Sequence, residues 1–288
     1  MTPHVIAPEK PKAAVVFVHG MAEHKERYFP FMTWLSEQGF ACVISDLRGH
    51  GADIPAEERG FFGKKGDGLL VEDTLEIVQL TRQQYPDLKV FLFGHSMGSL
   101  IVRCYAKKYD GTIDGLVVCG SPSKNPAAGP GIILTQLVGL FKGARYRSAF
   151  LESLTTGAYN KKFAAEGLEN AWLSTNKANV QAYNNDPLCG FRFTANGYQG
   201  LMRLMQDTYD PDDWTVANPT LPVHFIAGSD DPCIGSIKQF SQAVSFFRNR
   251  GYRTVTSKVY PNMRHEILNE LGKEDVWRDV CAILESWV

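Results

Sequence analysis

Short apolar runs bounded by turn-forming residues recur along most of the 288-residue chain. Such runs are typical of strands that are buried on both faces of a parallel sheet. Little room remains before the first clear run for the antiparallel strands that often begin such sheets, since only Pro3–Pro11 precedes it. The pattern therefore predicts six main strands: Ala13–Val18, Phe40–Ser45, Val90–Phe93, Leu116–Cys119, Val223–Ala227 and Thr254–Tyr260.

Segments with helical spacing of apolar residues separate these runs. Strands that alternate with helices are typical of an α/β architecture, in which helices flank a mostly parallel sheet. The predicted helices are Tyr28–Gln38, Leu69–Tyr85, Met97–Tyr109, Ile237–Arg250 and Lys273–Trp287.

The alternation fails between Pro122 and Ala217. A Pro/Gly-rich opening, Ser121–Gly131, leads there into helix-like segments without a convincing strand. We predict a helical cap inserted into the α/β core. In this division, residues 1–121 and 216–288 form the core and residues 122–215 form the cap.

One segment of the predicted cap, Gly131–Phe141, is strongly apolar and is followed by Lys142, Arg145 and Arg147. It is either a helix that touches a lipid interface or a helix packed over the active site. Its shortness favours the packed alternative. In both cases it would form a wall of a pocket.

The balance of charge excludes several classes of partner. Thirty basic and thirty-one acidic residues leave a formal net charge of −1, and no block of Lys and Arg would follow a phosphate backbone. We therefore expect no nucleic-acid partner. The first twelve residues lack the apolar region of a signal peptide, and no run is long enough to span a membrane, so we expect a soluble cytoplasmic protein.

Six cysteines form no C-x-x-C pair and mostly lie within apolar runs. This placement predicts buried free thiols rather than a zinc site or a disulfide framework. No metal or organic cofactor is expected. Cys233 is singled out because it follows a candidate catalytic acid by two residues, which would bring it near the pocket and make the protein sensitive to thiol reagents.

The pentapeptide Gly94-His95-Ser96-Met97-Gly98 matches G-x-S-x-G, with a predicted strand before it and a predicted helix after it. This setting is what a nucleophile elbow requires, because so sharp a turn leaves no space for side chains at the two glycine positions. A serine that only caps the next helix is the alternative. The flanking elements favour Ser96 as a nucleophile exposed at the edge of the sheet.

A serine hydroxyl needs an imidazole that accepts its proton. His265 lies in the loop after the last predicted strand, and the chain order of nucleophile, acid and histidine in such hydrolases requires a late histidine. We therefore predict His265 as the general base. The other histidines considered lie in early turn motifs or within a strand: His19, His24, His50, His95 and His224.

Two adjacent aspartates, Asp230 and Asp231, follow the strand Val223–Ala227, and spacing alone does not choose between them as the acid that orients the histidine. The first strand ends in a glycine turn, where backbone N–H groups can approach a developing oxyanion. The predicted donors are the amides of Met21 and Met97.

Three motifs together resemble the monoacylglycerol lipase and lysophospholipase branch of the α/β-hydrolases: H-G-x-x-E-H at His19–His24, D-L-R-G-H-G at Asp46–Gly51, and G-H-S-M-G. The family places its acid at the fourth position of G-x-x-D, which here is Asp231, and its histidine at His265. The stretch from Ala171 to Phe191 is similar to bacterial members, which implies a bacterial, intracellular relative.

The resemblance implies a serine esterase that cleaves a lipid monoester, such as a monoacylglycerol or a lysophospholipid, through an acyl-enzyme. Transient contact of the cap with a membrane is a further expectation. The alternatives are a general carboxylesterase or thioesterase and, in another class, a hydrolase-fold binding protein without turnover. Glu23, His24 and Arg27, and likewise Asp46 and Arg48, are interpreted as residues that hold loop geometry.

Overall fold

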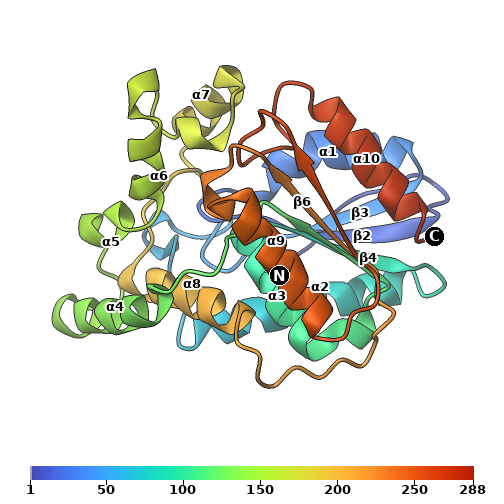
Figure 1. The fold of residues 1–288 in the computed structure, drawn as a ribbon, viewed down its shortest axis with the longest axis horizontal. Coiled ribbons are helices and arrows are strands. Elements are labelled where there is room, and N and C mark those ends of the chain that lie inside the picture. Colours follow the sequence, from blue (N-terminus) through green and yellow to red (C-terminus); the bar gives the residue numbers. More distant parts are fainter. Residues whose placement is uncertain (1) are drawn as a thin grey trace.

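A seven-stranded sheet runs through the middle of the molecule in the computed structural model, which describes residues 2–288 (Figure 1). The strand order is β1-β3-β2-β4-β5-β6-β7, and every neighbouring pair is parallel except β1 and β3. This arrangement confirms the predicted α/β class. The strands are β1 (His4–Ile6), β2 (Ala13–Val18), β3 (Phe40–Ile44), β4 (Val90–His95), β5 (Gly115–Cys119), β6 (Val223–Gly228) and β7 (Val255–Tyr260).

The expectation of six main strands with little room for an antiparallel one was wrong at the N-terminus. Strand β1 pairs antiparallel with β3, and His4 lies opposite Ile44. The His4 ring stacks on Phe29, with 4.3 Å between ring centroids. Three residues are enough for an edge strand that pairs on one side only, but they are too few to show a repeating pattern in the sequence.

Helices cover both faces of the sheet. Side chains of β2 alternate between two apolar clusters, with Val16 in the first and Phe17 in the second. Helices α2 (Gly66–Gln84), α3 (Met97–Tyr109), α8 (Ala195–Thr208) and α9 (Ile237–Asn249) contribute to the first cluster, and α1 (Phe29–Glu37) and α10 (Lys273–Glu285) contribute to the second. The sheet is thus buried on both sides, as its continuous apolar strands predict.

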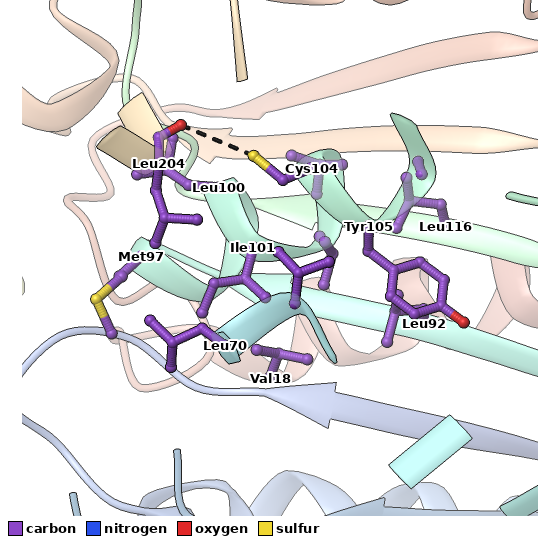
Figure 2. Packing of buried hydrophobic residues seen from close by; sticks show 14 of the residues in the cluster. Val18, Leu70, Leu92, Met97, Leu100, Ile101, Cys104, Tyr105, Leu116 and Leu204 are labelled. Atoms are coloured by element: carbon purple, nitrogen blue, oxygen red, sulfur yellow. Dashed lines mark hydrogen bonds between the residues drawn. The ribbon is translucent and has the colours of Figure 1, made fainter. Parts of the chain in front are cut away.

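The packing around α3 fixes the segment that follows the predicted nucleophile. Figure 2 shows Met97 and Ile101 of α3 on the side of the first cluster that holds Val18 and Leu70, and Leu100 on the side of Leu204. Every α3 residue from Met97 to Lys107 is buried. A helix enclosed on all sides has little freedom to move, so it holds the preceding turn rigidly.

The segment between β5 and β6 contains helices and, among the described residues, no strand. Its α-helices are α4 (Ala128–Lys142), α5 (Ala149–Ser153), α6 (Thr156–Lys162), α7 (Lys177–Asn185) and α8. Figure 1 shows α4 to α7, coloured green to yellow, gathered at the left of the view, beyond the carboxyl ends of the strands. The division into core and cap at residues 122 and 215 stays a prediction.

Helix α4 is packed on one side only. Leu134 and Val138 lie against the first apolar cluster. On the other side Leu140 and Phe141 are 76% and 77% exposed. The expectation of a packed helix therefore holds for one side, where α4 rests on α8. The expectation that Gly131–Phe141 forms a wall of the pocket was wrong, because none of these residues lines the cavity above Ser96.

All six cysteines are free and buried, as predicted. Within residues 2–288 no helix has both the length and the apolar character that crossing a bilayer requires.

Candidate active site

Ser96 lies in the sharp turn between β4 and α3. Its backbone has φ 55° and ψ −119°, a conformation that is strained for a residue with a side chain. A Cβ atom at Gly98 would collide with the backbone carbonyls of Val18 and His19, and one at Gly94 would collide with that of Gly98. The two glycines of G-x-S-x-G are therefore required for the steric reason that the sequence suggested.

Three side chains that are distant in sequence meet at this turn. His265 Nε2 lies 2.7 Å from Ser96 Oγ, and His265 Nδ1 lies 2.9 Å from Asp231 Oδ2. The geometry suits a hydroxyl that donates to Nε2 and an Nδ1–H that donates to a carboxylate, the arrangement that makes a serine nucleophilic. The structure brings these residues together; their catalytic roles stay predictions.

The two candidate aspartates have different surroundings. Asp231 is buried, and its second carboxylate oxygen accepts a hydrogen bond from the backbone N–H of Cys233 at 2.8 Å. Asp230 is exposed and accepts a bond from Ser229 Oγ at 3.0 Å. Only Asp231 is hydrogen-bonded to His265, and its side chain has no exposed surface, so its charge acts on the imidazole without screening by water.

The loop after β2 carries Met21, one of the two predicted oxyanion donors. Met21 and Met97 both line the cavity beside Ser96. The N–H of Gly20 is not available to bind an oxyanion, because it donates to Glu23 Oε1 at 2.5 Å. Met21 and Met97 therefore stay the predicted donors.

Residue Ala22 holds this loop between the core and the helical segment. Ala22 has a positive φ of 51°, which is uncommon for a residue with a side chain. Its carbonyl accepts hydrogen bonds from Tyr183 Oη at 3.0 Å and Gly190 N at 2.9 Å. Its N–H donates to His50 Nε2 at 3.2 Å. Burial lowers the pKa of His50 to about 3, so this imidazole is neutral and accepts the bond.

A buried ion pair lies directly behind the candidate triad. His95 donates from Nδ1 to Glu23 Oε1 at 3.4 Å and from Nε2 to the carbonyl of His265 at 3.2 Å. Burial alone lowers the pKa of His95, but the hydrogen bond and charge of Glu23 outweigh it and raise the pKa. Burial raises the pKa of Glu23, and His95 with Arg27 outweighs it and lowers the pKa. Both directions favour an imidazolium beside a carboxylate.

The sequence analysis grouped His95 with the turn histidines and missed this role. The one available signal was a histidine inside an apolar strand, immediately before the nucleophile. A buried polar side chain there needs partners, and Glu23 is one of them. The interpretation of Glu23 as a residue that holds loop geometry agrees with its bonds to Gly20, Tyr28 and Arg27.

Other motif residues also hold loops together. Arg27 Nη2 bonds Glu266 Oε2 at 2.5 Å, which links the loop after β2 to the residue next to His265. The backbone N–H of Lys25 donates to Asp46 at 2.9 Å. Arg48 pairs with Asp73, at 2.8 and 3.0 Å, rather than with Asp46.

A cavity of about 670 Å³ opens above Ser96 and His265. Its walls include the apolar side chains Leu154, Phe191, Leu201, Met202 and Met205. Arg192 is the only Lys or Arg among the lining residues, and its guanidinium pairs with Glu152 at 2.6 Å. The cavity therefore suits an apolar chain and offers no free cation to an anionic group.

Cys233 lines this cavity, with its Sγ 3.9 Å from His265 Nε2. Burial, followed by the charge of Asp231, raises the pKa of its thiol well above the usual value. The predicted position near the pocket is thus confirmed, while sensitivity to thiol reagents stays a prediction. Two groups among the described residues place metal-ligand atoms within 4.8 Å of one another: Asp231, Cys233 and His265, which coincide with the candidate triad, and His24, Asp186 and Cys189.

Comparison with known proteins finds relatives that are named as a lipase, a phospholipase and an esterase. A monoacylglycerol lipase of Mycolicibacterium smegmatis is 27% identical over 96% of this chain and 88% of its own length. Phospholipase YtpA of Bacillus subtilis is 24% identical over 97% of this chain and 98% of its own length. Among solved structures, a thermostable carboxyl esterase from Bacillus coagulans in complex with glycerol superposes with a TM-score of 0.90, at 27% identity, and covers 99% of this chain and 94% of that one.

The family described as serine aminopeptidase, S33, matches residues 9–272, which include Ser96, Asp231 and His265. The match spans most of the sheet and the whole helical segment between β5 and β6. The chain therefore belongs to this family of α/β-hydrolases.

Proposed function

We propose that the protein hydrolyses carboxylic esters of lipids through an acyl-enzyme. His265 takes the proton of Ser96 as Oγ attacks the ester carbonyl, and Asp231 stabilises the imidazolium that forms. The amides of Met21 and Met97 bind the oxyanion. The alcohol leaves with the proton from His265, and water then cleaves the acyl-enzyme by the same steps. The hydrogen-bonded Ser96, His265 and Asp231 at the floor of a cavity with both apolar and polar walls carry the proposal.

The cavity favours a neutral head group over a phosphate. Relatives of this chain are named monoacylglycerol lipase and phospholipase, which differ in this respect. A buried phosphate needs cationic or multiple hydrogen-bond partners to offset its desolvation. Among the described residues that line the cavity, Arg192 is the one Lys or Arg, and it already pairs with Glu152, while His95 is paired with Glu23. Glu23 and Glu266 also line the cavity. We therefore propose monoacylglycerols as the preferred substrate class.

We further propose that residues 122–215 act as a cap whose outer face makes transient contact with a lipid interface. Ile133, Leu140 and Phe141 of α4 are exposed, as are Phe150 and Leu154 nearby. Contiguous exposed apolar side chains often mark membrane-contact sites. Six buried free thiols suit a reducing compartment, which supports a cytoplasmic location, and the bacterial relatives support a bacterial origin.

A substrate panel tests the proposed chemistry. We expect the purified protein to cleave monooleoylglycerol faster than lysophosphatidylcholine and lysophosphatidic acid, and nitrophenyl octanoate faster than nitrophenyl acetate. A sharp preference for the acetyl ester would favour a general carboxylesterase instead. Faster cleavage of the lysophospholipids would contradict the proposed preference for a neutral head group. It would not affect the proposal that the protein hydrolyses esters.

Labelling with a fluorophosphonate tests the nucleophile independently of the substrate. We expect peptide mapping to find the label on Ser96 in the wild type, no label in Ser96→Ala, and much weaker labelling in His265→Ala. A folded wild type that resists labelling would favour a binding protein without turnover.

A further inference from the structure

His24 lies between two carboxylates, one at each ring nitrogen. Its Nδ1 is 2.5 Å from Glu26 Oε2, and its Nε2 is 2.8 Å from Asp186 Oδ2. A neutral imidazole carries only one N–H and therefore satisfies only one of the two acceptors. The second acceptor needs either a second proton on the ring or a cation beside Nε2.

A thiol completes this group. Asp186 and Cys189 belong to one turn after α7, in which the N–H of Cys189 donates to the carbonyl of Asp186 at 3.0 Å. The ligand atoms of His24, Asp186 and Cys189 all lie within 4.8 Å of one another. His24 and Cys189 are buried, and the side chain of Asp186 is 30% exposed, which leaves a route from solvent.

We propose that His24, Asp186 and Cys189 form a binding site for a divalent transition-metal ion of the zinc type. Imidazole nitrogen, carboxylate oxygen and thiolate sulfur are the donors that zinc prefers. Bonds of about 2.0–2.3 Å in a tetrahedral site hold ligand atoms roughly 3.3–3.8 Å apart, so only small side-chain shifts are needed. Water would take the fourth position.

Glu26 supports this assignment as an outer partner. Histidines that bind metals usually donate the other ring N–H to a carboxylate, which fixes the tautomer and the orientation of the ring. Glu26 takes this position at Nδ1, so Nε2 is directed at Asp186 and is the nitrogen available to an ion. None of the three proposed ligands lines the cavity above Ser96, so the site is separate from the proposed esterase chemistry.

Binding exchanges a proton for the ion. A thiol binds a metal as the thiolate, so the Cys189 proton must leave when zinc binds. That proton passes to the solvent, while His24 binds through Nε2 and keeps its Nδ1–H bonded to Glu26. The bound ion, one thiolate and one carboxylate then sum to zero charge, which suits a largely buried site.

The ion would join two parts of the molecule that form the cavity. His24 follows the loop of the predicted donor Met21, while Asp186 and Cys189 lie in the helical segment between β5 and β6. The adjacent bond from Gly190 N to the carbonyl of Ala22 already links these parts. We expect zinc to raise the melting temperature, because it binds the folded arrangement only.

Cobalt provides a direct readout of thiolate ligation. We expect Co²⁺, added to the reduced wild type, to give a thiolate-to-metal charge-transfer band at one equivalent, and Zn²⁺ to displace it. Cys189→Ser should lose the band and weaken Zn²⁺ binding at least about tenfold. Cys281→Ser is the matched control, because Cys189 and Cys281 are 8% and 6% exposed, and it should bind like the wild type.

Four further variants make the result decisive. Asp186→Asn and Glu26→Gln should each weaken Zn²⁺ binding, the second by about tenfold as an outer partner. Cys233→Ser should leave Zn²⁺ binding unchanged. A loss of Zn²⁺ binding in this variant would place the ion at the candidate triad and overturn the proposal. Absence of the cobalt band in the wild type, or full binding by Cys189→Ser, would also overturn it. Cys189→Ala repeats the test if the serine variant fails to fold.

Discussion

Helices α3 and α4 are both rich in apolar residues, yet their surroundings differ. Every residue of α3 from Met97 to Lys107 is buried between the sheet, α2 and α8. In α4 only Ala128 and Thr135 are buried. The helix that leaves Ser96 is therefore enclosed, whereas α4 has a free apolar face and contributes no residue to the lining of the cavity. The enclosed helix holds the turn at Ser96 rigidly, while the outer face of α4 leaves apolar side chains open to solvent.

The largest effect on activity should come from Asp231, the acid that is hydrogen-bonded to His265. Asp231→Asn should reduce kcat about 10⁴-fold, because the amide cannot stabilise the imidazolium and favours the wrong tautomer. Its neighbour provides the control, since Asp230 is exposed and makes no bond to His265. Asp230→Asn should remain within about twofold of the wild type in a nitrophenyl ester assay. Equal losses in the two variants would contradict the assignment of the acid.

A pair of truncations tests the contrast in packing directly. Leu100→Ala in α3 should lower the free energy of unfolding by about 2–5 kcal/mol, because it leaves a cavity in an enclosed site. Leu140→Ala in α4 should change it by less than about 0.5 kcal/mol, since this side chain is 76% exposed. Urea denaturation followed by circular dichroism measures both values. A large loss for Leu140→Ala would mean that the outer face of α4 is covered in solution.

The buried ion pair behind the triad should act through geometry. His95→Gln should reduce kcat roughly 10- to 100-fold with little change in KM, because the carbonyl of His265 loses a donor and the imidazole shifts. Glu23→Gln should act similarly through Gly20 and His95. A loss confined to KM would instead indicate that these residues contact the substrate.

The same pair predicts a dependence of stability on pH. Because the folded-state pKa of His95 is raised above 6.5, its contribution is fully present below about pH 6.5 and is lost as the pH rises through the raised value. The difference in unfolding free energy between wild type and His95→Gln should therefore shrink as the pH rises above about 6.5. A difference that grows over this range would show that His95 is neutral in the folded protein.

The smallest effect should come from the outer face of α4. The double variant Leu140→Ser, Phe141→Ser should reduce hydrolysis of monooleoylglycerol in vesicles roughly three- to tenfold, since part of the apolar contact with lipid is lost. Hydrolysis of soluble nitrophenyl butyrate should be unchanged. Leu271→Ser is the control, because Leu271 is 67% exposed but lies outside α4 to α8. Equal losses on both substrates would contradict a role at the interface.

Much of the fold and of the candidate site was predictable because it depends on local chemistry. The turn at Ser96 requires glycines on both sides, because a Cβ atom there would collide with the backbone. The helix Met97–Tyr109 has the bounds that the sequence predicted. His265 follows from its position after the last parallel strand. In each case a short segment contains the whole reason for the assignment.

Other features depend on neighbours that the sequence does not place. Asp230 and Asp231 are chemically identical, and the route of the chain after β6 decides which one contacts His265. Strand β1 exists because β3 offers it a free edge. The partners of His95, Glu23 and the carbonyl of His265, are 72 and 170 residues away in the chain.

The sequence by itself determined the α/β order of elements, the nucleophile turn and the late histidine, because steric limits and hydrophobic periodicity act within a few residues. Local spacing left the choice between Asp230 and Asp231 open and the family resemblance pointed to Asp231, but only the tertiary structure decided that it is buried against His265. The tertiary structure also decided which histidine pairs with a buried carboxylate and which side of α4 meets solvent. These properties follow from burial and from distances between segments far apart in the chain. Desolvation and hydrogen bonding, which set both pKa and exposure, act through space and not along the sequence.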